Sequence, residues 1–216
     1  MANGLELPAA QAPAGWQVAT GLTPHHVDDN GFGEYRAASY DELADCPVTM
    51  GRFFSAHFQA GGTDHRFVIT GGGGWVDTER LIEDTRRICE TQIAFWHDDG
   101  APPFDRYVFM LHASGDGYGG LEHRNSTALI CKRDDLPRHN SLSSSPRKTE
   151  GYTTLLGLIS HEYFHTWNVK QLRPDAFARY DYTQENYTQL LWFFEGFTSY
   201  YDDILLRRAG LIDDAT

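Results

Sequence analysis

The sequence predicts an α+β fold, in which the end of a β-rich domain precedes a unit made of a small mixed sheet and helices. Two observations carry this prediction: short aromatic or β-branched runs recur in the first 70 residues, and two long apolar patterns of helical period occupy the last third. A run of glycines at residues 71–74 separates the two compositions. We therefore expect residues 1–70 to be the carboxyl-terminal part of one domain and residues 71–216 the amino-terminal part of another.

The first 70 residues read as short strands joined by turns. Residues 1–15 are a lead-in rich in Ala, Pro and Gly, and strand patterns follow at 17–20, 53–59 and 66–70. Residues 39–45 predict a single helical turn capped by Ser39.

A long helix is predicted over residues 77–96. Asp77 is a suitable N-cap, and part of an apolar face is marked by Ile82, Cys89 and Ile93. The glycine run before it lacks the Gly-Lys-Ser/Thr ending of a phosphate-binding P-loop, so we interpret residues 71–74 as a hinge.

Two further strands are predicted, at residues 107–112 and 121–131, with a glycine-rich loop at 114–120 between them. Residues 132–150 contain two prolines and the run SLSSSP, which indicate a surface loop.

The pattern around which the chain is organised lies in residues 151–174. His161 and His165 are four residues apart and lie on one face of a helix, so both imidazoles can reach a single ion. Glu162, on a neighbouring face, can reach water held at that ion. Apolar residues at helical spacing support the helix, with Thr153 or Thr154 as its cap and Pro174 as its stop. This is the arrangement of a metallopeptidase.

A second helix, over residues 190–208, adds a third candidate ligand. Glu195 lies within an apolar run, where a carboxylate is costly to bury unless it is paired or binds a metal. Three protein ligands leave one position of tetrahedral zinc open to water or substrate. Two alternatives stay open: a peptide-binding module without catalysis, and a helical pair whose histidines are only surface residues.

Composition narrows the classes of partner. The net charge of −12 and the absence of a basic cluster argue against nucleic-acid binding. Residues 1–16 lack a signal peptide's basic start and apolar core, and no run is long enough to span a membrane. Three cysteines without a Cys-x-x-Cys pair indicate reduced thiols. We expect a cytoplasmic protein, unless an upstream signal precedes this sequence; its oligomeric state is not predicted.

Four stretches resemble the glycyl aminopeptidase family of zinc metallopeptidases, which belongs to the gluzincin group with a thermolysin-like catalytic core. They are GWQVATGL, PFDRYVFMLHASGDGYGGLEHRNSTALICKRDDLP, HEYFHTWNVKQLRP and FFEGFTSYYDDILLRRAGL. The resemblance implies one zinc ion per chain, held by His161, His165 and Glu195, with Glu162 as the general base. It also implies that residues 71–216 are part of a thermolysin-like zinc-peptidase catalytic unit, truncated at its carboxyl-terminal side.

The resemblance also implies a substrate-binding role for Gly119, Gly120 and Glu122. In related aminopeptidases this motif lays an edge strand beside the substrate, and its glutamate binds the free amino terminus. A carboxylate at the closed end of a groove would pair with an ammonium group and exclude longer substrates. The alternative is that Glu122 is one more surface acid.

The implied activity is release of the amino-terminal residue of a peptide, with Gly or Ala preferred. Family members are far longer at both ends, and the residue that stabilises the oxyanion is expected beyond Thr216. The alternative function is therefore a catalytically incomplete, zinc-containing peptide-binding fragment, weakly active or inactive.

Asp202 is our candidate for orienting a ligand histidine. It follows Glu195 by seven residues, about two helical turns, and so returns to nearly the same face. Asn168 and Ser199 are the next candidates. The competing interpretation makes Asp202 and Asp203 solvated acids.

Overall fold

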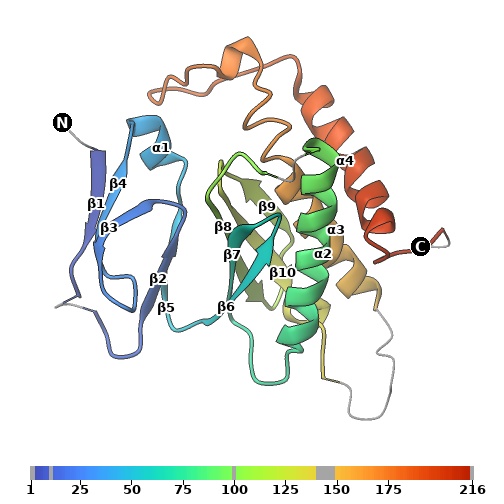
Figure 1. The fold of residues 1–216 in the computed structure, drawn as a ribbon, viewed down its shortest axis with the longest axis horizontal. Coiled ribbons are helices and arrows are strands. Elements are labelled where there is room, and N and C mark those ends of the chain that lie inside the picture. Colours follow the sequence, from blue (N-terminus) through green and yellow to red (C-terminus); the bar gives the residue numbers. More distant parts are fainter. Residues whose placement is uncertain (1–2, 10–11, 99–100, 140–148, 215–216) are drawn as a thin grey trace.

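The computed structural model describes residues 3–9, 12–98, 101–139 and 149–214. These residues form three sheets and four α-helices, which confirms the predicted α+β class. A five-stranded sheet lies between a group of amino-terminal strands on one face and helices α2, α3 and α4 on the other (Figure 1). None of the described helices is long and apolar enough to cross a bilayer.

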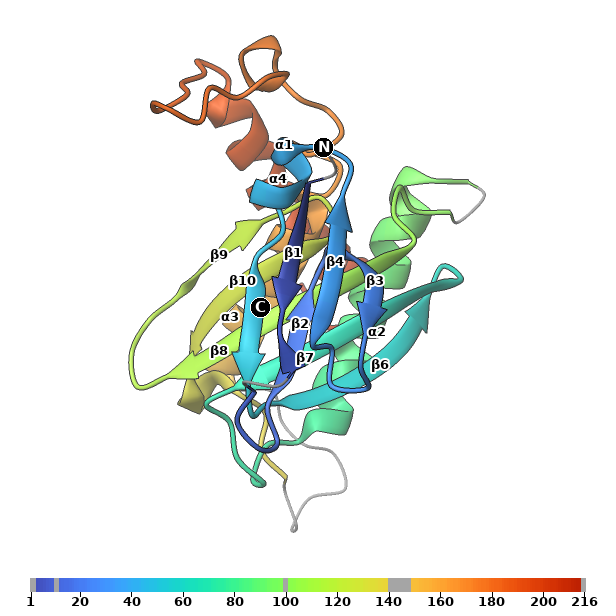
Figure 2. The same cartoon turned by 90° about the vertical axis from the view of Figure 1, so that its left-hand side faces the viewer.

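The amino-terminal unit contains two small antiparallel sheets and a short helix. The bounds are β1 Asn3–Leu7, β2 Gln17–Thr20, β3 Thr23–Val27, β4 Gly33–Ala37, α1 Tyr40–Ala44 and β5 Val48–Gly51. One sheet has the order β1-β4-β3, and β2 pairs with β5. Ser39 caps α1 as predicted, because its Oγ accepts a hydrogen bond from the backbone N–H of Glu42 at 3.1 Å. In the view of Figure 2, the strands of the amino-terminal unit lie in front of the five-stranded sheet.

The central sheet has the order β6-β7-β8-β10-β9. Its strands are β6 Phe54–Ala60, β7 Thr63–Thr70, β8 Arg106–Ser114, β9 Gly119–Glu122 and β10 Ser126–Lys132. The three inner strands are parallel, and the two edge strands β6 and β9 are antiparallel to their neighbours. The short edge strand β9 is the one that carries Glu122.

The strand pairing does not agree with the domain boundary that the sequence predicted between residues 70 and 71. β7, before that boundary, pairs along its length with β8, after it, so residues 53–70 belong to the sheet of the second unit. We place the division between β5 and β6. The glycine run is also not a free hinge: Gly71 has φ +76°, and a Cβ there would fall within 3.0 Å of the backbone of Ala113.

A second correction concerns residues 121–131, predicted as one strand. The structure has β9 and β10 with a reversal at residues 123–125. The chain reverses where three polar side chains leave the sheet for other partners. His123 and Arg124 bind Asp45, and Asn125 Nδ2 donates to the carbonyl of Gly21 at 2.9 Å.

The helices are α2 Thr78–Trp96, α3 Glu150–Phe164 and α4 Leu191–Arg208, with short 3₁₀ turns at Arg133–Asp135 and Asp175–Phe177. Asp77 caps α2 as predicted. The cap of α3 is Thr149 rather than Thr153 or Thr154, and this helix ends at Phe164, well before Pro174. Residues 165–172 continue as irregular turns, which begin with the tight bond from Thr166 N–H to Tyr163 O at 3.1 Å and include the wider one from Lys170 N–H to His165 O at 3.0 Å.

The main core lies between the central sheet and the helices. It is rich in aromatic residues, among them Phe67, Phe109, Tyr107, Tyr163 and Trp167, all buried. A smaller cluster, with Val68 and Val108, joins the other face of the sheet to the amino-terminal unit. The carboxyl-terminal half of α3 is therefore held on a rigid base.

Candidate metal centre

The side chains of His161, His165 and Glu195 converge between α3 and α4. His161 Nε2 lies 3.1 Å from His165 Nε2 and 3.4 Å from Glu195 Oε2, and His165 Nε2 lies 3.6 Å from Glu195 Oε1. Donor atoms bound at about 2.0–2.1 Å to a tetrahedral zinc ion lie about 3.3–3.4 Å from one another. The three donors therefore fit a zinc ion in chemistry and in spacing.

The other nitrogen of each ring is already used. His161 Nδ1 donates to Asp202 Oδ2 at 2.8 Å, and His165 Nδ1 donates to the backbone carbonyl of Asn168 at 2.9 Å. Because a carboxylate and a carbonyl only accept, each neutral ring carries its proton on Nδ1 and leaves a lone pair on Nε2. Both lone pairs face the point where Glu195 arrives, as metal binding requires.

Of the orienting residues that the sequence suggested, Asp202 and Asn168 lie at the histidines. Asn168 acts through its backbone carbonyl, while its side chain donates to Phe194 O and to Thr198 Oγ1, both at 3.2 Å. Ser199 is exposed on α4, and the described structure gives it no hydrogen bond to either histidine. Thr198, which lies 3.4 Å from His165 Nδ1, was not predicted, because a threonine in a helix carries no distinguishing sequence signal.

The ionisation of the cluster reflects competing effects. Burial lowers the pKa of His161, but the hydrogen bond to Asp202 and the negative charges of Glu162 and Asp202 together outweigh it, and the net shift is upward. Burial likewise opposes charge on His165, yet Glu195 raises its pKa above the ordinary value. The pKa of Glu195 is lowered, chiefly by its hydrogen bond to His165. Without a metal, the carboxylates thus make each imidazole easier to protonate than a free histidine, and the histidines make Glu195 easier to ionise.

Glu195 is less buried than the sequence suggested. Its side chain is 47 % exposed, and its apolar neighbours Leu191, Trp192 and Phe197 are also exposed. The expectation of a carboxylate within an apolar interior was therefore wrong. Glu195 meets the histidines because of its position on α4, and burial does not force it to have a partner.

Glu162 lies on the β9 side of α3, away from α4. It is 5 % exposed, and its Oε2 has no hydrogen-bond partner among the described residues. Its carboxyl group occupies the space where Gly120 would carry a Cβ, so any larger residue at that position of β9 would require the Glu162 side chain to shift. Gly119 has φ +152°, a conformation that favours glycine, and a Cβ there would meet nothing within 4 Å.

The pKa of Glu162 is raised to about 7, first by burial and then by the negative charges of Glu122 and Glu195, while the two histidines act against the rise. A carboxyl group with this pKa can both accept and release a proton near neutral pH, which suits a general acid and base.

Glu122 lies on the open side of the same cluster. A ligand atom from each of Glu122, Glu162 and His165 lies within 4.8 Å of the others. β9 is an edge strand, and its free side offers unpaired backbone groups to an extended chain. The structure thus brings Glu122 to within reach of a group bound at the centre.

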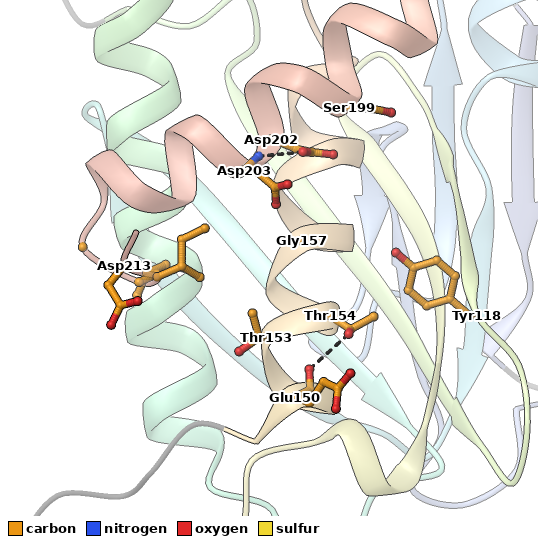
Figure 3. A pocket seen from close by; sticks show the side chains of 12 residues that line it. Tyr118, Glu150, Thr153, Thr154, Gly157, Ser199, Asp202, Asp203 and Asp213 are labelled. Atoms are coloured by element: carbon orange, nitrogen blue, oxygen red, sulfur yellow. Dashed lines mark hydrogen bonds between the residues drawn. The ribbon is translucent and has the colours of Figure 1, made fainter. Parts of the chain in front are cut away.

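A cavity of about 880 Å³ adjoins the centre along α3 and α4 (Figure 3). Tyr118 faces it from the β8–β9 loop, across from the two helices. Four of its lining residues are acidic: Glu150, Asp202, Asp203 and Asp213. Asp202 belongs both to this wall and to the hydrogen bond with His161, whereas His161, His165 and Glu195 themselves do not line the cavity.

A separate trio, His25, His26 and Glu34, lies on the surface of β3 and β4. The Arg36 guanidinium contacts the His25 ring, and its positive charge opposes a cation there. Among the described residues, the trio between α3 and α4 is the better metal site.

Family models of known proteins match residues in each of the two units. A family model described as M61 glycyl aminopeptidase matches residues 154–216, and one described as the peptidase M61 N-terminal domain matches residues 5–52, which end just before β6. No curated protein matched the chain.

Among solved structures, the chain is similar to the crystal structure of an aminopeptidase N family protein from Idiomarina loihiensis, with a TM-score of 0.84 and 43% sequence identity. The likeness covers 92% of this chain and 32% of that one, so this chain spans about a third of that protein's length. With the amino-terminal and catalytic models of one family matching in order, the chain belongs to the M61 glycyl aminopeptidase family.

Proposed function

We propose that the protein is a zinc-dependent aminopeptidase that hydrolyses the first peptide bond of peptides with a free amino terminus. The observation that carries this proposal is the set of three donor groups, whose nearest atoms lie 3.1–3.6 Å apart in each pair, with both histidine Nδ1 atoms already hydrogen-bonded. His161, His165 and Glu195 would hold the ion. When bound, zinc would supply Lewis-acid activation of the scissile carbonyl and of water.

Glu162 would carry the proton transfers. Its carboxylate takes a proton from the attacking water, and the resulting acid gives that proton to the amine as the C–N bond breaks. Its raised pKa, of about 7, makes both transfers accessible near neutral pH. Because Gly120 has no side chain, it leaves room for this carboxyl group against β9.

Glu122 would bind the ammonium group of the substrate. Its place at the end of the edge strand, close to Glu162 and His165, would align a peptide along β9 with its amino terminus at the centre. A charge-assisted contact there favours a free amine over a blocked one. Of the proposed preference for Gly or Ala, the family description supports the Gly part alone.

The alternative is a zinc-containing fragment that binds peptides without turning them over. The observation in its favour is that this chain spans only about a third of the matched structure. The two functions differ in turnover and share metal binding.

The test has two measurements on the full natural chain that carries these residues. Elemental analysis should give one zinc per chain, and release of Gly or Ala should be seen from unblocked peptides. Glu122→Ala should raise KM for unblocked peptides far more than for amino-blocked ones.

Asp116→Ala is the matched control, since it removes an exposed acid from the loop that precedes β9. Zinc binding without turnover would favour the alternative, and the absence of zinc would refute both functions. Equal losses for blocked and unblocked peptides would make Glu122 structural.

A further inference from the structure

We propose that Asp45, a residue of the amino-terminal unit, positions two sides of the candidate metal centre at once. Its carboxylate holds the turn that follows Glu122 and also the segment that follows His165. The inference rests on the proposed function, because it assigns Asp45 to the scaffold of that same site.

Asp45 is the residue that ends α1, and its side chain is only 14 % exposed. Four hydrogen bonds reach its two oxygens. Oδ1 accepts from His123 Nδ1 at 3.2 Å and from Lys170 Nζ at 2.9 Å, and Oδ2 accepts from the backbone N–H and the Nε of Arg124 at 3.1 and 3.2 Å. All four donors come from the catalytic unit.

The hydrogen bonds from His123 and Arg124 to Asp45 fix the end of β9. This edge strand is four residues long and pairs with β10 alone. At its carboxyl-terminal end Glu122 lies opposite Thr127 and the His123 N–H donates to Ser126 O at 2.9 Å, so the hairpin holds the backbone while the side chains after Glu122 turn to Asp45. His123 and Arg124 come directly after Glu122, and both are bound to Asp45. The direction of the Glu122 side chain therefore depends on a carboxylate outside the sheet.

The second contact fixes the segment after α3. The backbone N–H of Lys170 donates to His165 O at 3.0 Å, and the same segment carries the Asn168 carbonyl that accepts from His165 Nδ1. Lys170 Nζ, almost buried, is tied to Asp45. Holding Lys170 thus holds the turn that sets the tautomer of His165.

The charge on Asp45 is needed for this arrangement. Lys170, whose side chain is 12 % exposed, would be a nearly buried cation if the carboxylate were absent, which is costly, while Arg124, 28 % exposed, would keep only its contact with Asp41. Burial by itself favours the neutral acid, but His123 and Lys170 outweigh it and hold the pKa of Asp45 far below its usual range. The carboxylate remains ionised through the neutral range.

Asp41 provides a matched control on the same helix. Its carboxylate accepts from Arg124 Nη2 at 2.7 Å and from the Tyr182 hydroxyl at 2.6 Å. It has no hydrogen bond to His123, to the Arg124 backbone or to Lys170 in the described structure. Asp41→Asn and Asp45→Asn therefore remove the same charge beside the same arginine, and only Asp45→Asn should loosen the centre.

The first experiment measures amide hydrogen exchange and zinc affinity in the full natural chain. Asp45→Asn should lose protection at the amides of Arg124 and Lys170, and its zinc affinity, by competition with a chromophoric chelator, should fall roughly 10-fold. Asp41→Asn should stay within about twofold of wild type in zinc affinity. Neither measurement needs turnover, so the proposed enzymatic activity can fail while this inference stands.

The second experiment uses peptides. If the protein is an aminopeptidase, Asp45→Asn should raise KM for unblocked peptides roughly 10-fold more than for blocked ones, because Glu122 is displaced. If Asp45→Asn does not fold, Lys170→Met removes one contact and should lower zinc affinity with little effect on that KM ratio. Unchanged zinc affinity in Lys170→Met, or an Asp45→Asn variant indistinguishable from Asp41→Asn, would overturn the proposal.

Discussion

Helices α3 and α4 both contribute to the candidate metal centre, yet they are held very differently. α3 packs against the sheet, α2 and α4, and its carboxyl-terminal half is almost wholly buried, with His165 only 2 % exposed. In the amino-terminal half of α4 only Phe194 and Thr198 are buried, and Glu195 lies between exposed Trp192 and Phe197. Packing therefore preorganises the two histidines, while the position of the third ligand, Glu195, depends on how α4 lies against α3.

The largest effect should separate the two glutamates. Glu162→Gln should keep one zinc per chain and lower turnover by about 10²–10⁴-fold, because an amide cannot accept a proton from water. Glu195→Gln should instead weaken zinc binding, since it changes a donor atom. Turnover at saturating zinc and metal content measure the two effects, and a Glu162→Gln variant that stays active would remove Glu162 from the chemistry.

Packing should show the same contrast in stability. Replacing Leu156, in the buried part of α3, by Ala should lower the free energy of unfolding by about 2–5 kcal/mol. Trp192→Ala on α4 should change it by less than about 0.5 kcal/mol, because that side chain is 68 % exposed. Urea denaturation measures both. A Trp192→Ala cost equal to that of Leu156→Ala would break the comparison, because α4 would then be covered in solution.

The buried carboxyl group of α3 should make stability depend on pH when the metal is removed. Since the pKa of Glu162 is raised from 4.5 to about 7, mainly by burial, its protonated form stabilises the fold. This contribution, about 3 kcal/mol, is complete below pH 4.5 and is lost as the pH rises through 7. Denaturation of chelator-treated protein between pH 4.5 and 8 should show the loss, and Glu162→Gln should lack it. Parallel curves for the two proteins would contradict the raised pKa.

The contact between β9 and α3 should be sensitive to a single methyl group. Gly120→Ala would place a Cβ on the Glu162 carboxyl group, and we expect a cost of about 1–3 kcal/mol and lower turnover. Gly157→Ala is the control on α3 itself, because nothing lies within 4 Å of its Cβ position. That change should be neutral or stabilise the helix by up to about 1 kcal/mol. Equal stability of the two variants would show that Glu162 can move aside.

A further effect should come from the side chain by which α4 supports α3. Asp202→Asn should weaken zinc binding by about 10–100-fold, because Asp202 holds the Nδ1 proton of His161. Asp203→Asn, one residue further and without a contact to either histidine in the described structure, is the control. Chelator competition measures both affinities. If the two variants bind zinc equally, the orientation of His161 does not depend on Asp202.

Local signals in the sequence predicted most of the elements. Asp77 and Ser39 cap helices where expected, and β2, β6, β8 and α4 lie within a residue or two of their predicted bounds. The spacing of His161 and His165 also placed both rings on one face. These features depend on residues a few positions apart, so periodicity and capping suffice to read them.

Contacts between distant residues were decided by the tertiary structure alone. The sequence could not show that residues 121–131 reverse, that the sheet runs across residue 70, or that Glu195 stays half exposed. The Gly120–Glu162 contact depends on how α3 packs against β9, and the hydrogen bonds between Asp45 and His123 or Lys170, 78 and 125 residues away, depend on how the two units pack. No local pattern encodes them, because a hydrogen bond between distant segments leaves no period in the sequence of either.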